Sequence, residues 1–272
     1  MISLYKKFNW LSLDVVIGAM AAYRMAALLA DGFGLFQWQT AVVLGLVVFI
    51  IYGLDRIIDN RNIVQNTARH QFRNQHKILI IRVLIGCLIA TTVLLFWLPK
   101  AVIFFGIGLF AFVVGYLLMV SITQSKGWFE AAKDVIVPLV YALGVWGIAA
   151  VPQPYISQES LILFFPFWLI AQQNLLIIAY FESFEAEDGE SLPIILGEDS
   201  TKIALNIIFL LVIMLCFWVI MISPYHYAVR VAILLIVMAT IQHFIWKNPQ
   251  RWLENDTYRL ITEGVFLIPL LA

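Results

Sequence analysis

Two aspartates with helical spacing stand at the end of the second long apolar stretch of the chain. Residues 48–60 read VFIIYGLDRIIDN, and the acids are Asp55 and Asp59. On a helix, the i, i+4 spacing places both carboxylates on one face, roughly 6 Å apart. Mg²⁺ prefers oxygen ligands and is commonly held by one or two carboxylates together with substrate phosphates. The pair therefore indicates a magnesium site at the end of an apolar helix. The alternative is that the two acids simply end the hydrophobic span, with Arg56 and Arg61 beside them.

A second acidic cluster follows a later apolar stretch. Residues 177–188 read IIAYFESFEAED, with acids at Glu182, Glu185 and Asp188. Aligned on the first acid without gaps, residues 50–55 match the first six residues of this segment. The match hints at an internal repeat in which four helices are followed by four related ones. An acidic loop gains nothing from an anionic membrane surface, so we interpret the cluster as a second cation site. A solvated acidic loop is the alternative.

The composition indicates a polytopic membrane protein. The chain is 62% hydrophobic and 12% charged, whereas soluble domains have roughly 45–50% apolar and about 25% charged residues. We expect residues 1–272 to form a single all-α transmembrane domain surrounded by the lipid bilayer, with no nucleic-acid partner. The first apolar run carries Asp14 and Arg24 and has no small-residue cleavage site, so it predicts a retained helix. Cys87 and Cys216 lie inside apolar runs and are predicted to be inert buried thiols.

Nine apolar stretches approach the length of about 20 residues that a membrane-spanning helix needs. They cover residues 12–30, 37–58, 78–98, 101–121, 131–150, 160–181, 203–222, 226–246 and 257–271. Excess Lys and Arg mark the cytoplasmic side of a membrane protein. With the N-terminus in the cytoplasm, that side receives Lys6, Lys7, Arg56, Arg61, Arg69, Arg73, Lys77, Lys126, Lys133, Lys202, Lys247, Arg251 and Arg259, and the other side receives Lys100. We therefore expect a multi-pass protein of the plasma (inner) membrane, with both acidic clusters on its cytoplasmic face.

Several polar side chains fall within the predicted spans. Gln172, Gln173 and Asn174 are successive, and Gln242 and Glu263 lie in later spans. Ionisable groups at membrane depth cost about 2.5–3.5 kcal/mol and usually face the protein interior. For Gln172 and Gln173 we favour hydrogen bonds between helices, which polar residues in membranes commonly make. Asn174 could instead line a cavity that leads to the second acidic cluster.

These motifs together resemble the UbiA family of intramembrane prenyltransferases. In that family an NxxxDxxxD-type motif follows helix 2 and a DxxxD-type motif follows helix 6. Asp55 and Asp59 match the acids of the first motif, although Ile51 stands at the position of its asparagine. The second motif with its flanking residues is matched by Tyr180, Glu182, Glu185, Asp188, Gly189, Ser191, Leu192, Pro193 and Gly197, with Glu182 and Glu185 replacing aspartates. Lys133-Asp134, followed by VIVPLVYALGVWG, resembles the family's helix 5, and Arg69 stands where the family often has a diphosphate-facing arginine.

The resemblance implies an enzyme that moves a prenyl group from a polyprenyl diphosphate to a lipid-soluble acceptor, foremost an aromatic ring. Mg²⁺ would be held by Asp55, Asp59, Glu182 and Glu185, with Asp188 as a further ligand. The diphosphate would be contacted by Arg69, Lys133, Arg56 and Lys126. The replaced motif residues favour one alternative, a UbiA-like protein that binds an isoprenoid without catalysis. The polar span residues and the repeat favour another, a transporter of unrelated fold.

Overall fold

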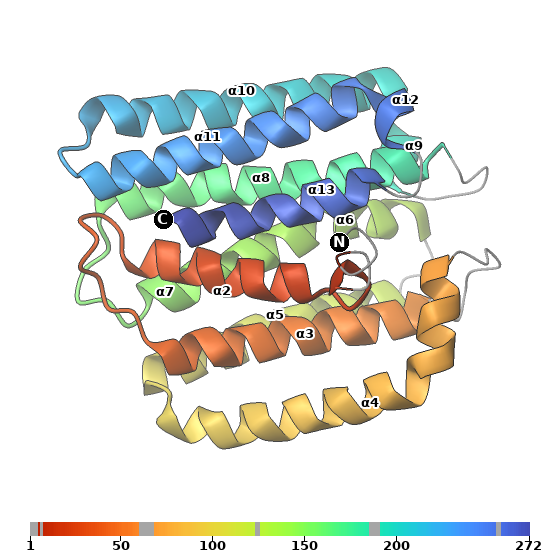
Figure 1. Ribbon diagram of the computed structural model, residues 1–272, viewed down its shortest axis with the longest axis horizontal. Coiled ribbons are helices and arrows are strands. Elements are labelled where there is room, and N and C mark those ends of the chain that lie inside the picture. Colours follow the sequence, from red (N-terminus) through yellow and green to blue (C-terminus); the bar gives the residue numbers. More distant parts are fainter. Residues whose placement is uncertain (1–4, 6–7, 60–67, 123–125, 185–190, 254–256) are drawn as a thin grey trace.

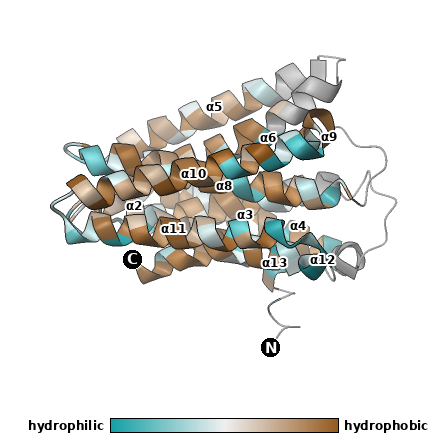
Figure 2. Ribbon diagram, turned by 90° about the horizontal axis from the view of Figure 1, so that it is seen from above, coloured by the Kyte–Doolittle hydropathy of each residue, from teal (hydrophilic) through white to brown (hydrophobic). Residues whose placement is uncertain are grey.

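The computed structural model describes residues 5, 8–59, 68–122, 126–184, 191–253 and 257–272. It describes their side chains except at residues 55–59, 68–74, 117–122, 126–131 and 133. The described chain is helical and contains no strand. Most of its helices lie side by side along the long axis of the molecule (Figure 1). Hydrophobic residues dominate the middle of this bundle and hydrophilic ones are concentrated toward its ends (Figure 2).

Each of the predicted spans falls on a helix or on consecutive helical segments. The longer elements are α2 (Leu13–Ala27), α3 (Trp38–Asp59), α4 (Ala68–Leu94), α5 (Lys100–Ile122), α6 (Lys126–Ala142), α8 (Gln158–Glu182), α10 (Glu198–Ile222) and α11 (His226–Lys247). The shorter ones are η1 (Leu95–Trp97), η2 (Leu143–Gly147), α7 (Ile148–Ala150), α9 (Leu192–Leu196), α12 (Pro249–Trp252), α13 (Thr257–Gly264) and η4 (Val265–Leu271). The predicted all-helical class is therefore confirmed.

Within the described residues, four helices are long and apolar enough to cross a membrane. They are Gln75–Trp97, Gln158–Glu182, Glu198–Ile222 and His226–Lys247. Shorter apolar helices cover Trp38–Leu54, Lys100–Tyr116 and Asp134–Ala150. In hydrocarbon, a helix satisfies its own backbone hydrogen bonds, which is why such apolar runs become helices. The count of nine crossings and the cytoplasmic N-terminus remain predictions.

Small residues let α2 approach its neighbours closely. Ala19, Ala22 and Ala27 of this helix are fully buried. A Cβ added at Gly18 would lie 2.8 Å from the carbonyl oxygen of Phe266, so η4 passes directly over the helix backbone. Small residues of this kind are typical of interfaces between membrane helices, where van der Waals contact drives association.

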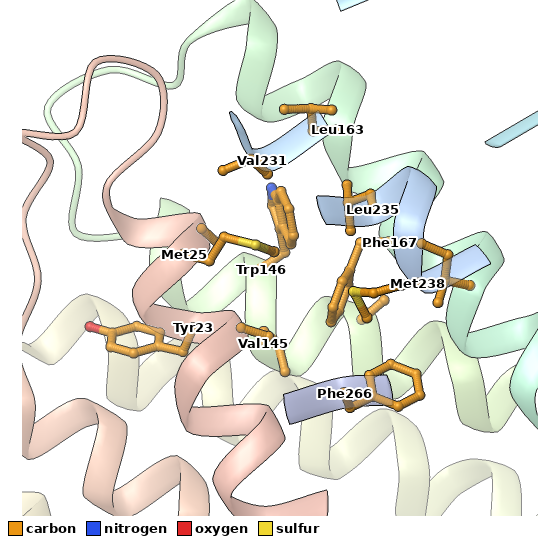
Figure 3. Packing of buried hydrophobic residues seen from close by; sticks show 14 of the residues in the cluster. Tyr23, Met25, Val145, Trp146, Leu163, Phe167, Val231, Leu235, Met238 and Phe266 are labelled. Atoms are coloured by element: carbon orange, nitrogen blue, oxygen red, sulfur yellow. The ribbon is translucent and has the colours of Figure 1, made fainter. Parts of the chain in front are cut away.

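Aromatic side chains fill the centre of the bundle. Trp146 of η2, Phe167 of α8 and Phe266 of η4 point into one cluster (Figure 3). The ring centroids of Trp146 and Phe167 are 5.1 Å apart, and those of Phe167 and Phe266 are 6.3 Å apart. The indole N–H of Trp146 donates to the carbonyl oxygen of Ser160 at 3.0 Å, which satisfies the one polar atom of the indole.

A proline in α6 explains one contact between helices. Pro138 has no N–H, so the carbonyl of Asp134, four residues earlier, lacks its usual donor within the helix. Gln172 Nε2 of α8 donates to this carbonyl at 2.9 Å. The predicted interhelical hydrogen bond of Gln172 is thereby confirmed. For Gln173, which is fully buried, the expected hydrogen bond is not found among the described residues.

Candidate functional site

The two helices that precede the acidic clusters end at the same end of the bundle. The carboxyl ends of α3 and α8 both lie toward the end that carries α9 and α12 (Figure 1). Asp55 and Asp59 occupy the last turns of α3, and Glu182 is the last residue of α8. The side chains of Asp55, Arg56 and Asp59 lie outside the described residues.

The side chains of the other predicted site residues, apart from Glu182, also lie outside the described part of the chain. Glu185 and Asp188 belong to residues 185–190, whose placement is not described. Arg69, Lys126 and Lys133 belong to helices, but their side chains are likewise outside the described set. Their proposed roles at the metal or the diphosphate therefore remain predictions.

Glu182, the described member of the predicted ligand set, forms an ion pair with Arg259 of α13. The Arg259 side chain is 13% exposed and the Glu182 side chain is 49% exposed. A charge-assisted hydrogen bond to a guanidinium is among the stronger polar contacts in proteins. A cation binding Glu182 would therefore have to share this carboxylate with Arg259.

Arg259 was not among the predicted site residues. The sequence did assign it to the same side of the membrane as the acids. Its pairing with Glu182 joins residues that are 77 positions apart, so no local spacing could indicate it.

A second contact fixes the chain beyond the acidic cluster. The backbone N–H of Leu192, the first residue of α9, donates to Asp134 Oδ2 at 2.9 Å. A carboxylate in this position satisfies one of the free N–H groups at the start of a helix. The chain is thus held to α13 at Glu182 and to α6 at Leu192, on either side of residues 185–190. Asp134 immediately follows Lys133, one of the residues predicted to contact the diphosphate.

The chemistry of the predicted ligands suits a hard cation, because carboxylate oxygens are the donors that Mg²⁺ prefers. The described residues contain no group of three or more His, Cys, Asp or Glu side chains that could hold a metal. Glu182 is the one predicted ligand whose side chain belongs to that described set.

A separate polar cluster joins the N-terminal segment to α2 and α13. Asn9 Nδ2 donates to Asp14 Oδ2 at 2.5 Å and to Glu263 Oε2 at 2.6 Å. All three side chains are at most 5% exposed. Tyr5 donates from its hydroxyl to the carbonyl oxygen of Leu260 at 3.1 Å. Burial, with smaller contributions from Asp14 and Glu263, raises the pKa of Tyr5 to about 12.

This cluster explains how two acids near the ends of their helices are accommodated away from water. The sequence marked Asp14 and Glu263 as costly residues within predicted spans. Asn9, which bridges them, lay outside the spans and carried no signal of its own. We interpret the cluster as structural, because each acid accepts a hydrogen bond from the protein.

Comparison of the chain with protein-family models, with curated proteins and with solved structures finds no match. The resemblance to the UbiA family therefore rests on the sequence motifs.

Proposed function

We propose that this protein is a UbiA-like prenyltransferase, an enzyme that transfers a prenyl group from a polyprenyl diphosphate to a lipid-soluble acceptor with the help of Mg²⁺. The observation that carries the proposal is that the relevant parts of three helices lie toward the same end of the bundle. The acid-bearing ends of α3 and α8 lie there (Figure 1), and Asp134 of α6 binds the start of α9 just beyond the second acidic cluster.

In this proposal the chemistry is electrostatic. When the allylic C–O bond of the donor breaks, negative charge develops on the departing diphosphate, and nearby cations stabilise it. Mg²⁺ supplies such a charge and orients the diphosphate. Asp55 and Asp59 would hold the metal from α3, and Arg69 and Lys133 would contact the diphosphate oxygens. The prenyl tail would extend between helices into the bilayer, where the lipid acyl chains solvate an apolar chain.

A second candidate is a UbiA-like protein that binds an isoprenoid without transferring it. The ion pair between Glu182 and Arg259 favours this candidate, because one proposed metal ligand already has a cationic partner within the protein. The longer arm of glutamate also shifts any metal relative to an aspartate site, and Mg²⁺ demands near-ideal octahedral geometry.

Binding of a prenyl diphosphate to the detergent-purified protein separates the two candidates. Thermal unfolding is recorded with farnesyl and longer prenyl diphosphates, each with and without Mg²⁺. The variants are Asp55→Ala, Asp59→Ala and, as a matched control, Asp199→Ala. The control removes one carboxylate from the first turn of α10, at the same end of the bundle but outside both acidic clusters.

For the enzyme we expect a Mg²⁺-dependent rise in the unfolding temperature that both α3 variants lose and the control keeps. Stabilisation that is independent of Mg²⁺ and unaffected by Asp55→Ala would identify the non-catalytic isoprenoid binder. If no chain length stabilises the folded protein, neither candidate survives.

A further inference from the structure

A cavity of about 580 Å³ opens at the end of the bundle where α8, α10 and α11 meet α12. Two lysines line this cavity. Lys202 lies in the first turns of α10, and Lys247 is the last residue of α11. One acid, Glu198, also lines it. The charged groups of the wall therefore sum to a net positive charge.

Each of the two lysines contacts another side chain of the cavity wall. Lys202 Nζ lies 2.6 Å from Glu198 Oε1. That carboxylate also accepts from the Tyr180 hydroxyl at 3.3 Å. Lys247 Nζ lies 4.4 Å from the centroid of the Trp246 ring. An ammonium group has three donors, so the bond to Glu198 leaves Lys202 with donors for an anion.

The cavity lies on a different side of α8 from Glu182, the described member of the proposed metal ligands. Tyr180 and Glu182 are two residues apart on α8, which turns them about 200° from each other around the helix. Tyr180 contacts Glu198 of α10 on the cavity side, whereas Glu182 contacts Arg259 of α13.

An apolar stripe on α10 begins beside the cavity. It follows helical spacing through Ile203, Ile207, Leu210 and Met214, which are between 52% and 66% exposed. The helix is hydrophobic along most of its length (Figure 2) and is one of those long and apolar enough to cross a membrane. The stripe therefore offers a surface for acyl chains on the face of α10 next to the one that lines the basic cavity.

We propose that the cavity binds the phosphate headgroup of an anionic phospholipid, with its acyl chains along the α10 stripe. Basic pockets between membrane helices are known to bind anionic headgroups, and each lysine near an anionic membrane surface strengthens binding about fivefold. Lys202 and Lys247 contact the phosphate in this assignment, while Glu198 and Tyr180 keep Lys202 in position. The site needs no divalent metal and goes beyond the proposed transferase activity.

Native mass spectrometry and thermal unfolding of the detergent-purified full chain test the proposal. The probes are phosphatidylglycerol, phosphatidylcholine and inorganic phosphate, all without Mg²⁺. Lys202→Gln/Lys247→Gln is compared with Lys77→Gln/Lys100→Gln, which removes the same charge from exposed positions on α4 and α5. We expect bound phosphatidylglycerol and stabilisation by it, with about 30-fold weaker binding in the first variant and unchanged binding in the second.

Three results would overturn the proposal. The first is equal binding of phosphatidylcholine and phosphatidylglycerol, and the second is inorganic phosphate stabilising the protein as well as the lipid does. The third is equal loss of lipid in the control variant. If the double glutamine variant does not fold, the single variants decide the question, because each is expected to weaken phosphatidylglycerol binding about fivefold. Prenyl diphosphate binding, tested separately, is not affected by any of these outcomes.

Discussion

Replacing Gln172 by methionine should destabilise the bundle because it leaves a backbone carbonyl without a donor. Pro138 deprives the carbonyl of Asp134 of its helical partner. Gln172 Nε2 supplies the missing hydrogen bond from α8 at 2.9 Å. Methionine has a similar size and no donor, so the change removes the bond with little change in volume.

The expected cost is about 1 kcal/mol. A buried acceptor left without a partner costs about 1–3 kcal/mol, and hydrogen bonds between membrane helices contribute about 0.6–2 kcal/mol. Gln172 Oε1 is itself buried without a partner among the described residues. Removing that atom offsets part of the loss, which places the expected cost in the lower part of these ranges.

A double-mutant cycle isolates the contact. Pro138→Ala restores an N–H that can donate to the Asp134 carbonyl within α6. In that background Gln172→Met should cost less than about 0.5 kcal/mol, so the double variant should be at least about 0.5 kcal/mol more stable than the sum of the two single costs implies. Gln173→Met is the adjacent control. Since Gln173 makes no hydrogen bond within the described protein, its replacement should be neutral or stabilising.

Equilibrium unfolding in mixed micelles of a mild detergent and sodium dodecyl sulfate, followed by tryptophan fluorescence, gives the four free energies. The proposed role of Pro138 would be refuted if Gln172→Met cost the same in both backgrounds. The proposed role of the Gln172 amide would be refuted if Gln173→Met were the more destabilising of the two single variants.

Three further predictions concern other parts of the bundle. Gly197→Ala should lower the free energy of unfolding by about 1–3 kcal/mol, since Gly197 has φ 80° and ψ 162°, a conformation almost restricted to glycine. The same unfolding assay measures this loss. An unchanged free energy of unfolding would show that alanine adopts the conformation without strain. Asn9→Leu should lower the free energy of unfolding by roughly 3 kcal/mol because it removes the buried donor shared by Asp14 and Glu263. A loss below about 1 kcal/mol would show that the two acids do not depend on the Asn9 amide. Tyr5 should titrate near pH 12, as a raised pKa means that the folded state holds the phenol proton more tightly than the unfolded chain does. Its contribution to stability should be fully present below pH 10 and lost as the pH rises toward 12. The difference in absorbance at 295 nm between the native protein and Tyr5→Phe measures that titration, and a midpoint near 10 would contradict burial of the hydroxyl.

The local features of this chain could be predicted from its sequence. The apolar stretches at 160–181, 203–222 and 226–246 coincide closely with α8, α10 and α11. A chain in hydrocarbon must satisfy its backbone hydrogen bonds within the segment, so length and composition alone dictate a helix. The spacing of residues within a helix could also be predicted from the sequence, and it places Asp55 and Asp59 about one turn apart on α3.

The partners of the polar side chains were decided by the tertiary structure. Arg259 pairs with Glu182, and Leu192 donates to Asp134, across 77 and 58 residues of sequence. Asn9 reaches Glu263 across 254 residues. Lipid is as apolar as the interior of a membrane protein, so the pattern of apolar residues does not reveal which face of a helix meets another helix. Which acids keep a free carboxylate for a cation therefore depends on how the helices are rotated and ordered, and only the folded bundle determines that.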